Sequence, residues 1–368
     1  MKVAILLVLL CLPALADLAA GRQALKNGDY PTALKEFLPL AKQGDASAQL
    51  LLGLMYHDGQ GVPQDYREAV RWYRLAAGQG DASAQFNLGF MYDMGQGVPR
   101  EYKEAVQWYR LAAEQGDASA QLCLGVIYHE GEGIPQDYKE AAKWYRLAAE
   151  QGKASAQDFL GVMYHEGQGV QQDFNEAAKW YRLAGEQGNA SAQFNLGFMY
   201  DEGQGVPQDY KEAVRWYRLA AEQGDEKGQV NLGVMYDHGQ GVPQDYKEAV
   251  RWYRLAAGQG DEKGQAHLGL KYDKGEGVPQ DYKEAAKWYR LAAEQGDRSA
   301  ELILGLMYEN GKGMPQDYIQ AHMWFNLAGA AGDGDGIKGR DEVASKMTPG
   351  QIAEAQRLAR EWKPKARP

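Results

Sequence analysis

The apolar residues of the chain follow a pattern that repeats every 36 residues between residues 45 and 332. Within each repeat, apolar positions three or four residues apart predict two amphipathic helices, residues 46–58 and 66–77 in the first copy. The second helix carries a tryptophan that recurs eight times, at Trp72, Trp108, Trp144, Trp180, Trp216, Trp252, Trp288 and Trp324. Eight copies without insertions predict stacked repeats rather than a closed globule. Each indole can bury about 150–250 Å², so we expect the tryptophans to be the main cohesive contacts.

Glycine, proline and aspartate mark the helix ends in every repeat. Gly59 can adopt the left-handed conformation that closes the first helix, and Pro63 prevents its continuation. Asp65 is expected to cap the second helix, with Glu68 completing a capping box. Weaker boundaries are expected in the second repeat, where Arg100-Glu101 replaces the usual Gln-Asp pair, and in the fourth, where Gln171 replaces the proline.

A glycine lies in the middle of every first helix, as Gly53 does in the first repeat. Glycine costs about 1 kcal/mol relative to alanine at such a position. Its recurrence therefore predicts that two backbones approach too closely there for a side chain. The apolar stripe of the same helix is formed by Ala48, Leu52 and Met55.

The segments outside the repeats have different roles. Residues 1–16 combine a positive start, an apolar stretch and a small-residue cleavage signature, so we expect a signal peptide that is cleaved after Ala16. Residues 17–44 predict an N-terminal capping helix pair, with Glu36 in place of the tryptophan. Residues 333–368 predict C-terminal capping helices and a basic tail, with Trp362 among the residues that cover the last repeat.

Composition narrows the chemistry. A formal net charge of -10 argues against non-specific nucleic-acid binding, which needs a basic surface. Cys11 lies between bulky leucines, which disfavours the alternative of a lipoprotein. Its removal leaves Cys123 without a partner for a disulfide, so we expect a buried thiol.

Neither a metal, a cofactor nor a catalytic site is predicted. His57, His129 and His165 alternate with acidic residues at one repeat position. However, packed helices lie about 8–10 Å apart, too far for such side chains to share one ion. The Gly-x-Gly loop lacks the Lys-Ser/Thr of a phosphate loop and is assigned to helix capping. No serine, histidine and aspartate spacing typical of hydrolases stands out.

The repeat unit A-x-A-x-x-x-L-G-x-x-Y-x-x-G-x-G-V-x-x-D-x-x-x-A-x-x-W-Y-x-x-A-A-x-x-G closely resembles the Sel-one-like repeat, a relative of the tetratricopeptide repeat. The match is carried in the first copy by Ala46, Ala48, Leu52, Gly53, Tyr56, Gly59, Gly61, Val62, Asp65, Ala69, Trp72, Tyr73, Ala76, Ala77 and Gly80. The resemblance covers residues 45–332 and implies an all-α, right-handed α-solenoid of stacked antiparallel helix pairs, a tetratricopeptide-like superhelix. It also implies an adaptor that binds proteins or peptides. Some cysteine-rich members are linked to penicillin binding, and this chain lacks their paired cysteines.

One stripe of the first helices varies between copies while the scaffold stays constant, and we expect the partner-binding surface there. The hypothesis is a peptide groove on the concave face, with asparagine amides binding extended backbone and phenylalanines as apolar anchors. Its candidate residues are Asn87, Phe90, Asn195, Phe198, Asn231 and His267. The alternative is that the phenylalanines belong to the core between repeats and that the asparagines are solvated.

A second candidate is an anion-binding patch in the sixth and seventh repeats. It consists of Lys227, Lys263, Lys271 and Lys274, which cluster on first helices in an otherwise acidic chain. The alternative is a solvated helix face whose lysines pair locally with Glu226 and Glu262.

Together these inferences predict a non-enzymatic, monomeric scaffold, periplasmic or secreted, that binds a protein or peptide in envelope regulation or assembly. No membrane span is expected after signal cleavage. Two alternatives stay open: a cell-wall-associated or β-lactam-binding envelope protein, and a secreted factor for host interaction.

Overall fold

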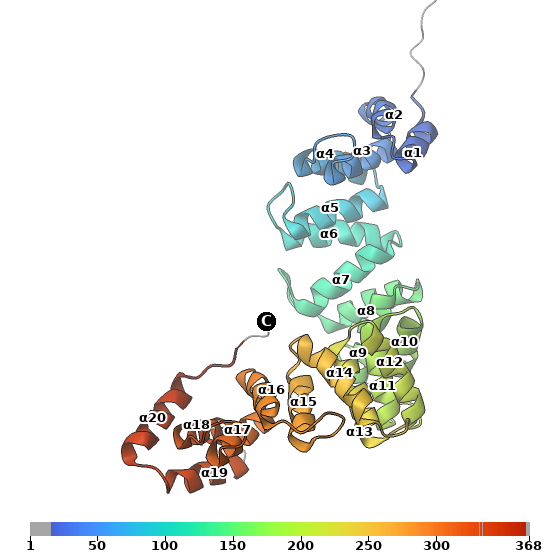
Figure 1. Ribbon diagram of the computed structural model, residues 1–368. Coiled ribbons are helices and arrows are strands. Elements are labelled where there is room, and N and C mark those ends of the chain that lie inside the picture. Colours follow the sequence, from blue (N-terminus) through green and yellow to red (C-terminus); the bar gives the residue numbers. More distant parts are fainter. Residues whose placement is uncertain (1–15, 331, 333, 366–368) are drawn as a thin grey trace, which may run out of the picture. The chain divides into compact units, whose positions relative to one another are not determined.

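The computed structural model describes residues 16–330, 332 and 334–365, and in these residues it contains 20 helices and no strand. The expected signal peptide, residues 1–16, lies outside the described residues except for Ala16. Two compact units are present, Met1–Gln172 and Asp173–Pro368, here called the N-terminal and the C-terminal unit. Within each unit, helix pairs stack in chain order (Figure 1). The predicted all-α fold of stacked helix pairs is confirmed.

Repeats one to eight each supply a first and a second helix. The first helices are α3 (Ala46–Asp58), α5 (Ala82–Met94), α7 (Ala118–Glu130), α9 (Ala154–Glu166), α11 (Ala190–Glu202), α13 (Glu226–His238), α15 (Glu262–Lys274) and α17 (Arg298–Asn310). The second helices are α4 (Tyr66–Gly78), α6 (Tyr102–Glu114), α8 (Tyr138–Glu150), α10 (Phe174–Glu186), α12 (Tyr210–Glu222), α14 (Tyr246–Gly258), α16 (Tyr282–Glu294) and α18 (Tyr318–Ala330). Flanking them are α1 (Leu18–Lys26), α2 (Tyr30–Lys42), α19 (Gly334–Ala344) and α20 (Pro349–Glu361). No helix of the described residues is long and apolar enough to cross a bilayer.

The helix caps follow the sequence prediction with two corrections. Gly59 closes α3 with a φ of 71°, and Asp65 accepts hydrogen bonds from the backbone N–H groups of Arg67 and Glu68. The Glu68 carboxylate does not complete a capping box, because it pairs with Arg71 at 3.3 Å, and the Asp65 N–H donates to the Tyr56 carbonyl instead.

Of the two boundaries expected to be weaker, only one lacks its cap. Glu101 makes no side-chain cap hydrogen bond to α6. In the fourth repeat Asp173 caps α10 as fully as its counterparts cap their helices. Loss of the preceding proline at Gln171 leaves this capping carboxylate in place, which is why the boundary is intact.

The mid-helix glycines make room for an aromatic ring rather than for a second backbone. A Cβ atom built on Gly53 would lie 2.5 Å from the ring of Tyr73 on the paired helix. The same clash recurs between Gly233 and Tyr253, at 2.6 Å. The prediction of a close approach is therefore right, but the partner is the buried aromatic ring that follows the repeat tryptophan, a tyrosine here and Phe325 in repeat eight.

Three kinds of contact join consecutive repeats. Trp252 of α14 packs into a core cluster with α12 and α13, so the tryptophan bridges to the preceding repeat. Arg218 of α12 donates a hydrogen bond from Nη2 to the Tyr236 hydroxyl of α13 at 2.8 Å. The equivalent bond occurs in Arg74–Tyr92, Arg110–Tyr128, Arg146–Tyr164, Arg182–Tyr200, Arg254–Tyr272 and Arg290–Tyr308.

The third contact is a buried glutamine at the start of the first helix in repeats one to seven. Gln229 Nε2 donates to the Ala221 carbonyl at 3.2 Å, and its Oε1 accepts from Gln259 Nε2 at 2.9 Å. In repeat eight the equivalent residue is Glu301, which is 4% exposed. Burial, together with the Asp297 carboxylate, raises the pKa of the Glu301 carboxyl to about 7. Only the protonated carboxyl can donate a hydrogen bond as the glutamine amide does.

We therefore expect Glu301→Gln to stabilise the C-terminal unit at pH 8 but not at pH 4.5. Since the folded-state pKa lies above the ordinary value of 4.5, the folded chain holds a proton between these two values. In the parent chain, the stability contributed by the protonated Glu301 carboxyl is therefore lost as the pH rises from 4.5 through 7, and it stays absent above that pH. The expected gain at pH 8 is about 1–3 kcal/mol. Urea denaturation at the two pH values measures it.

Gln265→Glu provides the matched control, because it makes the reverse change one repeat earlier. It should introduce a loss of stability at pH 8 that is absent at pH 4.5. A gain from Glu301→Gln of equal size at both pH values would contradict the assignment, since a pH-independent effect cannot come from ionisation of the carboxyl.

Candidate functional site

Two first helices of neighbouring repeats border a pocket of about 330 Å³ in the C-terminal unit. The pocket lies between α11 and the start of α13. Its lining residues are Ser191, Phe194, Asn195, Gly224, Asp225, Glu226 and Lys227. Two residues predicted as parts of separate sites, Asn195 of the peptide groove and Lys227 of the anion patch, are thereby brought together.

The chemistry of this pocket is mixed. The Lys227 ammonium lies 5.7 Å from the centre of the Phe194 ring, within the range of a cation–π contact. Asp225 accepts the N–H of Gly228 as the cap of α13, and burial raises the pKa of its carboxyl. An ammonium, an amide and an aromatic ring beside two carboxyls can bind a peptide segment, but they do not form a site for small anions alone.

Sequence reasoning missed Phe194. It lies one residue before the stripe that was singled out, half-buried, with its ring 5.9 Å from that of Tyr217. Its repeat position also varies between copies, where the seventh repeat has Ala266 and the fourth has Asp158. This variation between copies could have identified Phe194, since it is as large as the variation at the next position, that of Asn195.

The other predicted groove residues are placed as follows. Asn87 Nδ2 donates to the Ser83 carbonyl at 2.8 Å, and Asn231 Nδ2 donates to the Lys227 carbonyl at 3.0 Å. One N–H of each amide is thus engaged within its own helix. Phe90 and Phe198 are half-buried and pack against core clusters between repeats. These two phenylalanines therefore belong to the core between repeats, as the alternative interpretation of the sequence proposed.

His267 packs on the second helix of the preceding repeat. Its ring stacks on that of Tyr253, with 4.7 Å between centroids and 10° between planes. Burial lowers the pKa of the imidazole, which favours its neutral form. The same repeat position holds Phe159, stacked on Tyr145 at 5.1 Å, and Cys123, whose thiol pKa burial raises to about 11. This position therefore serves packing between repeats.

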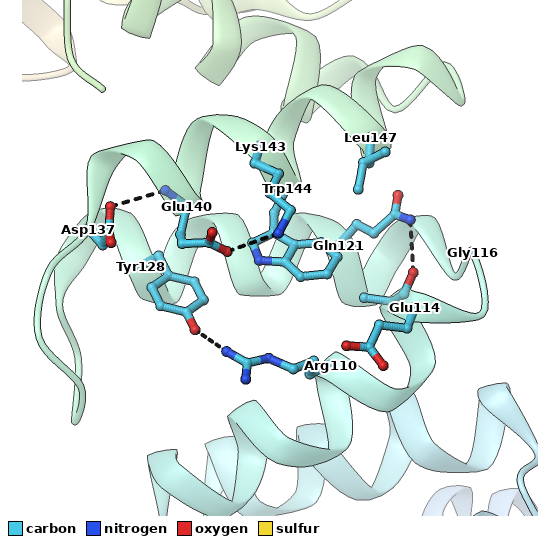
Figure 2. Close-up of a pocket in the computed structure, with 11 residues that line it drawn as sticks. Arg110, Glu114, Gly116, Gln121, Tyr128, Asp137, Glu140, Lys143, Trp144 and Leu147 are labelled. Carbon is cyan, nitrogen blue, oxygen red and sulfur yellow. Dashed lines mark hydrogen bonds and ion pairs between the residues drawn. The ribbon is translucent and has the colours of Figure 1, made fainter. Parts of the chain in front are cut away.

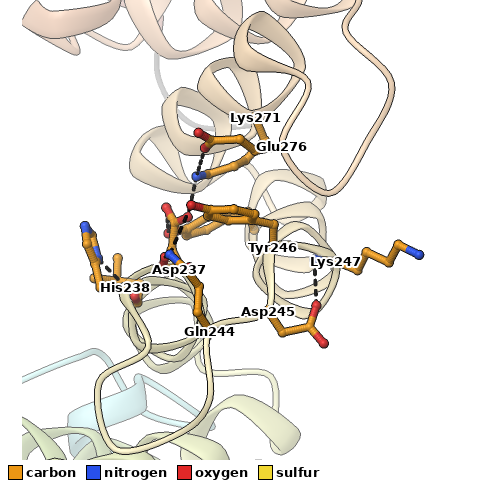
Figure 3. Close-up of polar contacts among 10 residues, drawn as sticks. Asp237, His238, Gln244, Asp245, Tyr246, Lys247, Lys271 and Glu276 are labelled. Carbon is orange, nitrogen blue, oxygen red and sulfur yellow. Dashed lines mark hydrogen bonds and ion pairs between the residues drawn. The ribbon is translucent and has the colours of Figure 1, made fainter.

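The anion patch requires one correction. Lys263 and Lys274 are exposed, but Lys271 is only 2% exposed because it occupies the core position that Met235 holds one repeat earlier. Its ammonium pairs with Asp237 and, at 2.7 Å, with Glu276 (Figure 3). Two carboxylates neutralise this lysine, so it is unavailable to an external anion.

This cluster is the polar arrangement that departs most clearly from the repeat pattern. The Lys271 ammonium also lies 4.8 Å from the centre of the Tyr246 ring, and the Tyr253 hydroxyl donates to Asp237 Oδ2 at 3.4 Å. Lys271 and Asp237 are both buried. Such a closed ion pair links repeats six and seven and presents no reactive group to a substrate.

Metal-binding geometry does not occur among the described residues, where no three histidine, cysteine or acidic side chains converge. The histidines that share a repeat position instead make local contacts at the ends of first helices. His57 Nδ1 lies 2.7 Å from Asp58, and His129 Nδ1 lies 2.7 Å from Glu130.

Comparison with known proteins agrees with this architecture. The Sel1 repeat family matches eight consecutive segments, residues 46–81, 82–117, 118–153, 154–189, 190–225, 227–261, 263–297 and 298–333. A Sel1 repeat protein from Oxalobacter formigenes is 33% identical over 88% of this chain and 93% of its own, with a TM-score of 0.67. A protective antigen of uropathogenic Escherichia coli that displays an SLR fold is 33% identical over 94% of both chains, with a TM-score of 0.50. No curated protein matches the chain. The chain therefore belongs to the Sel1 repeat family, whose paired-helix repeats are scaffolds for protein–protein interactions.

Proposed function

We propose that the chain is an exported, non-enzymatic scaffold that binds an extended segment of a protein partner on the first-helix face of its C-terminal unit. The partner is held in the periplasm or outside the cell, where the complex serves envelope regulation or assembly. The pocket between α11 and α13 carries this proposal, because there an amide, an ammonium and an aromatic ring line one hollow.

Each group has a separate part in recognition. The Asn195 amide offers a donor and an acceptor of the kind that a peptide bond matches. Lys227 supports a carbonyl or carboxylate of the segment, and Phe194 supplies apolar surface beneath it. Export is supported by the sequence of residues 1–16, and the family supports binding of a protein rather than catalysis.

Photo-crosslinking from position 191 tests this site, because Ser191 is exposed and lines the pocket. We expect a crosslinked partner in the envelope fraction of the native cell. The double variant Asn195→Ala, Lys227→Ala should weaken its binding at least about tenfold, as expected for loss of hydrogen bonds that include a charged donor. Sequencing of the N-terminus of the purified chain should give Asp17 as the first residue.

Asn87→Ala is the matched control. Asn87 occupies the position of Asn195 in repeat two, where the following repeat has Ser119 in place of Lys227. It should leave the crosslinked species unchanged. Recovery of the same partner at equal yield from the double variant would refute the pocket as the binding site.

A further inference from the structure

The C-terminal segment of the chain is bound to repeats seven and eight, and the side chains of the segment make most of the contacts. The Trp362 ring lies edge-on to that of Trp324, with 6.3 Å between centroids. Leu358 of α20 packs against the same core cluster. Lys365 completes the contact: its backbone N–H donates to the Glu294 carbonyl at 2.7 Å, and its ammonium pairs with the Glu294 carboxylate at 2.8 Å. A helix end that carries an aromatic ring and, three residues later, a lysine thus covers this surface.

The same surface is open five repeats earlier, in the N-terminal unit. A groove of about 740 Å³ lies along α6, α7 and α8 (Figure 2). Trp144 and Glu114, which line it, occupy the repeat positions of Trp324 and Glu294. Tyr128 and Leu147 line it as well, and the Leu147 side chain is 37% exposed although it is a large apolar group.

Charges in the groove leave one acidic group for a ligand. The Arg110 guanidinium donates to the Tyr128 hydroxyl, and Glu140 pairs with Lys143 at 3.4 Å. The Asp137 carboxylate caps α8. Glu114, by contrast, is exposed and makes no ion pair with the described residues, whereas its counterpart Glu294 pairs with Lys365. It also lies at the C-terminal end of α6, where free carbonyl groups favour a cation.

Leucine at the position of Leu147 is exposed in neighbouring repeats too. Leu75 and Leu111 of the same unit are 46% and 44% exposed, so apolar surface accompanies the groove on the second helices. The sequence alone does not distinguish these leucines from core residues, because an apolar residue at helical spacing next to the tryptophan is expected in the core.

We propose that the groove of α6, α7 and α8 binds the amphipathic helical end of a partner protein that carries an aromatic ring followed three residues later by a lysine. The ring packs against Trp144 and Leu147, and the lysine pairs with Glu114. This surface is formed by α6, α7 and α8 of the N-terminal unit and shares no residue with the pocket around Asn195 in the C-terminal unit.

A labelled peptide with the sequence of residues 349–365 is the probe. It is used with the full chain, whose own C-terminal segment already covers the equivalent surface of repeats seven and eight. Fluorescence anisotropy should show saturable binding. Trp362→Ala in the peptide and Glu114→Lys in the protein should each weaken binding at least about tenfold, as for central interface residues. A peptide with Lys365→Glu should recover affinity for the Glu114→Lys protein.

Glu222→Lys is the matched control, since Glu222 occupies the same position in the C-terminal unit, and it should leave affinity unchanged. Equal affinity of the Glu114→Lys and parent chains would overturn the proposal, as would loss of binding in Glu294→Lys alone, which would mean that the peptide displaces the chain's own tail. Sedimentation of the full chain should find a monomer. Dimers abolished by Glu114→Lys would identify a second copy as the occupant and overturn the assignment to another protein.

Discussion

Replacing Asp237 with alanine is expected to lower the free energy of unfolding of the C-terminal unit by about 3–5 kcal/mol. The substitution removes a carboxylate that pairs with Lys271, an ammonium that is only 2% exposed. A buried charge that loses its partner retains its desolvation penalty, so the loss exceeds what the pair itself contributes. Because Glu276 still contacts Lys271 at 2.7 Å, we expect a value near the lower end of this range. Urea denaturation followed by circular dichroism measures it.

Asp201→Ala is the matched control. Asp201 accepts the Tyr217 hydroxyl at 3.2 Å, as Asp237 accepts that of Tyr253, but the position of Lys271 is held there by Met235. The control substitution should therefore cost only about 1 kcal/mol, the contribution of a hydrogen bond.

The variant Lys271→Met restores the residue of the neighbouring repeats and closes a double-mutant cycle. Alone it should also be destabilising, by up to about 3–5 kcal/mol, because the buried Asp237 carboxylate then loses its ammonium partner. In its presence Asp237→Ala should cost little more than the control. An equal cost of Asp237→Ala with and without Lys271 would contradict the account, because it would mean that the two side chains are not coupled.

The helices and most of their caps could be predicted from the sequence because each depends on residues within a few positions. Gly59 and Asp65 are examples, since a left-handed glycine and a capping carboxylate act on the adjacent turn. The expected capping box was wrong because Glu68 has a competing partner in Arg71 one turn away, a choice that the spacing alone does not decide.

The side-chain environment of the candidate site was harder to predict. Lys271 was assigned to an exposed patch although Met55, its equivalent in repeat one, was assigned to the core stripe. Because Met55 and Lys271 occupy the same position of the repeat, an alignment of the repeats would have indicated that Lys271 is buried. Its partner Asp237 could not be inferred in the same way, because the pairing depends on the distance between successive repeats. The role of Phe90 likewise depends on how far the next repeat overlaps its ring.

Trp252→Ala is expected to lower the stability of the contact between repeats five and six by about 3–5 kcal/mol. The Trp252 side chain is 6% exposed and packs among Ala213, Val214 and Leu232, so its removal leaves a cavity between neighbouring helix pairs. In a repeat protein, stability is approximately a sum of intrinsic repeat terms and nearest-neighbour terms, so one weakened junction separates the blocks on either side. We therefore expect the urea transition to broaden or to divide into two steps.

Two further variants distinguish the loss of packing at the junction from a general effect of truncating a side chain on α14 and from the loss of the indole N–H. Leu255→Ala makes a comparable truncation on α14, but this side chain is 45% exposed and should change stability by no more than about 0.5 kcal/mol. In Trp252→Phe much of the ring volume is kept, and the buried Trp252 Nε1 makes no hydrogen bond to the described residues, so the loss should be well below that of Trp252→Ala. If Trp252→Ala lowered stability no more than Leu255→Ala, the tryptophans could not be the main cohesive contacts between repeats. Their recurrence would then need a different physical explanation.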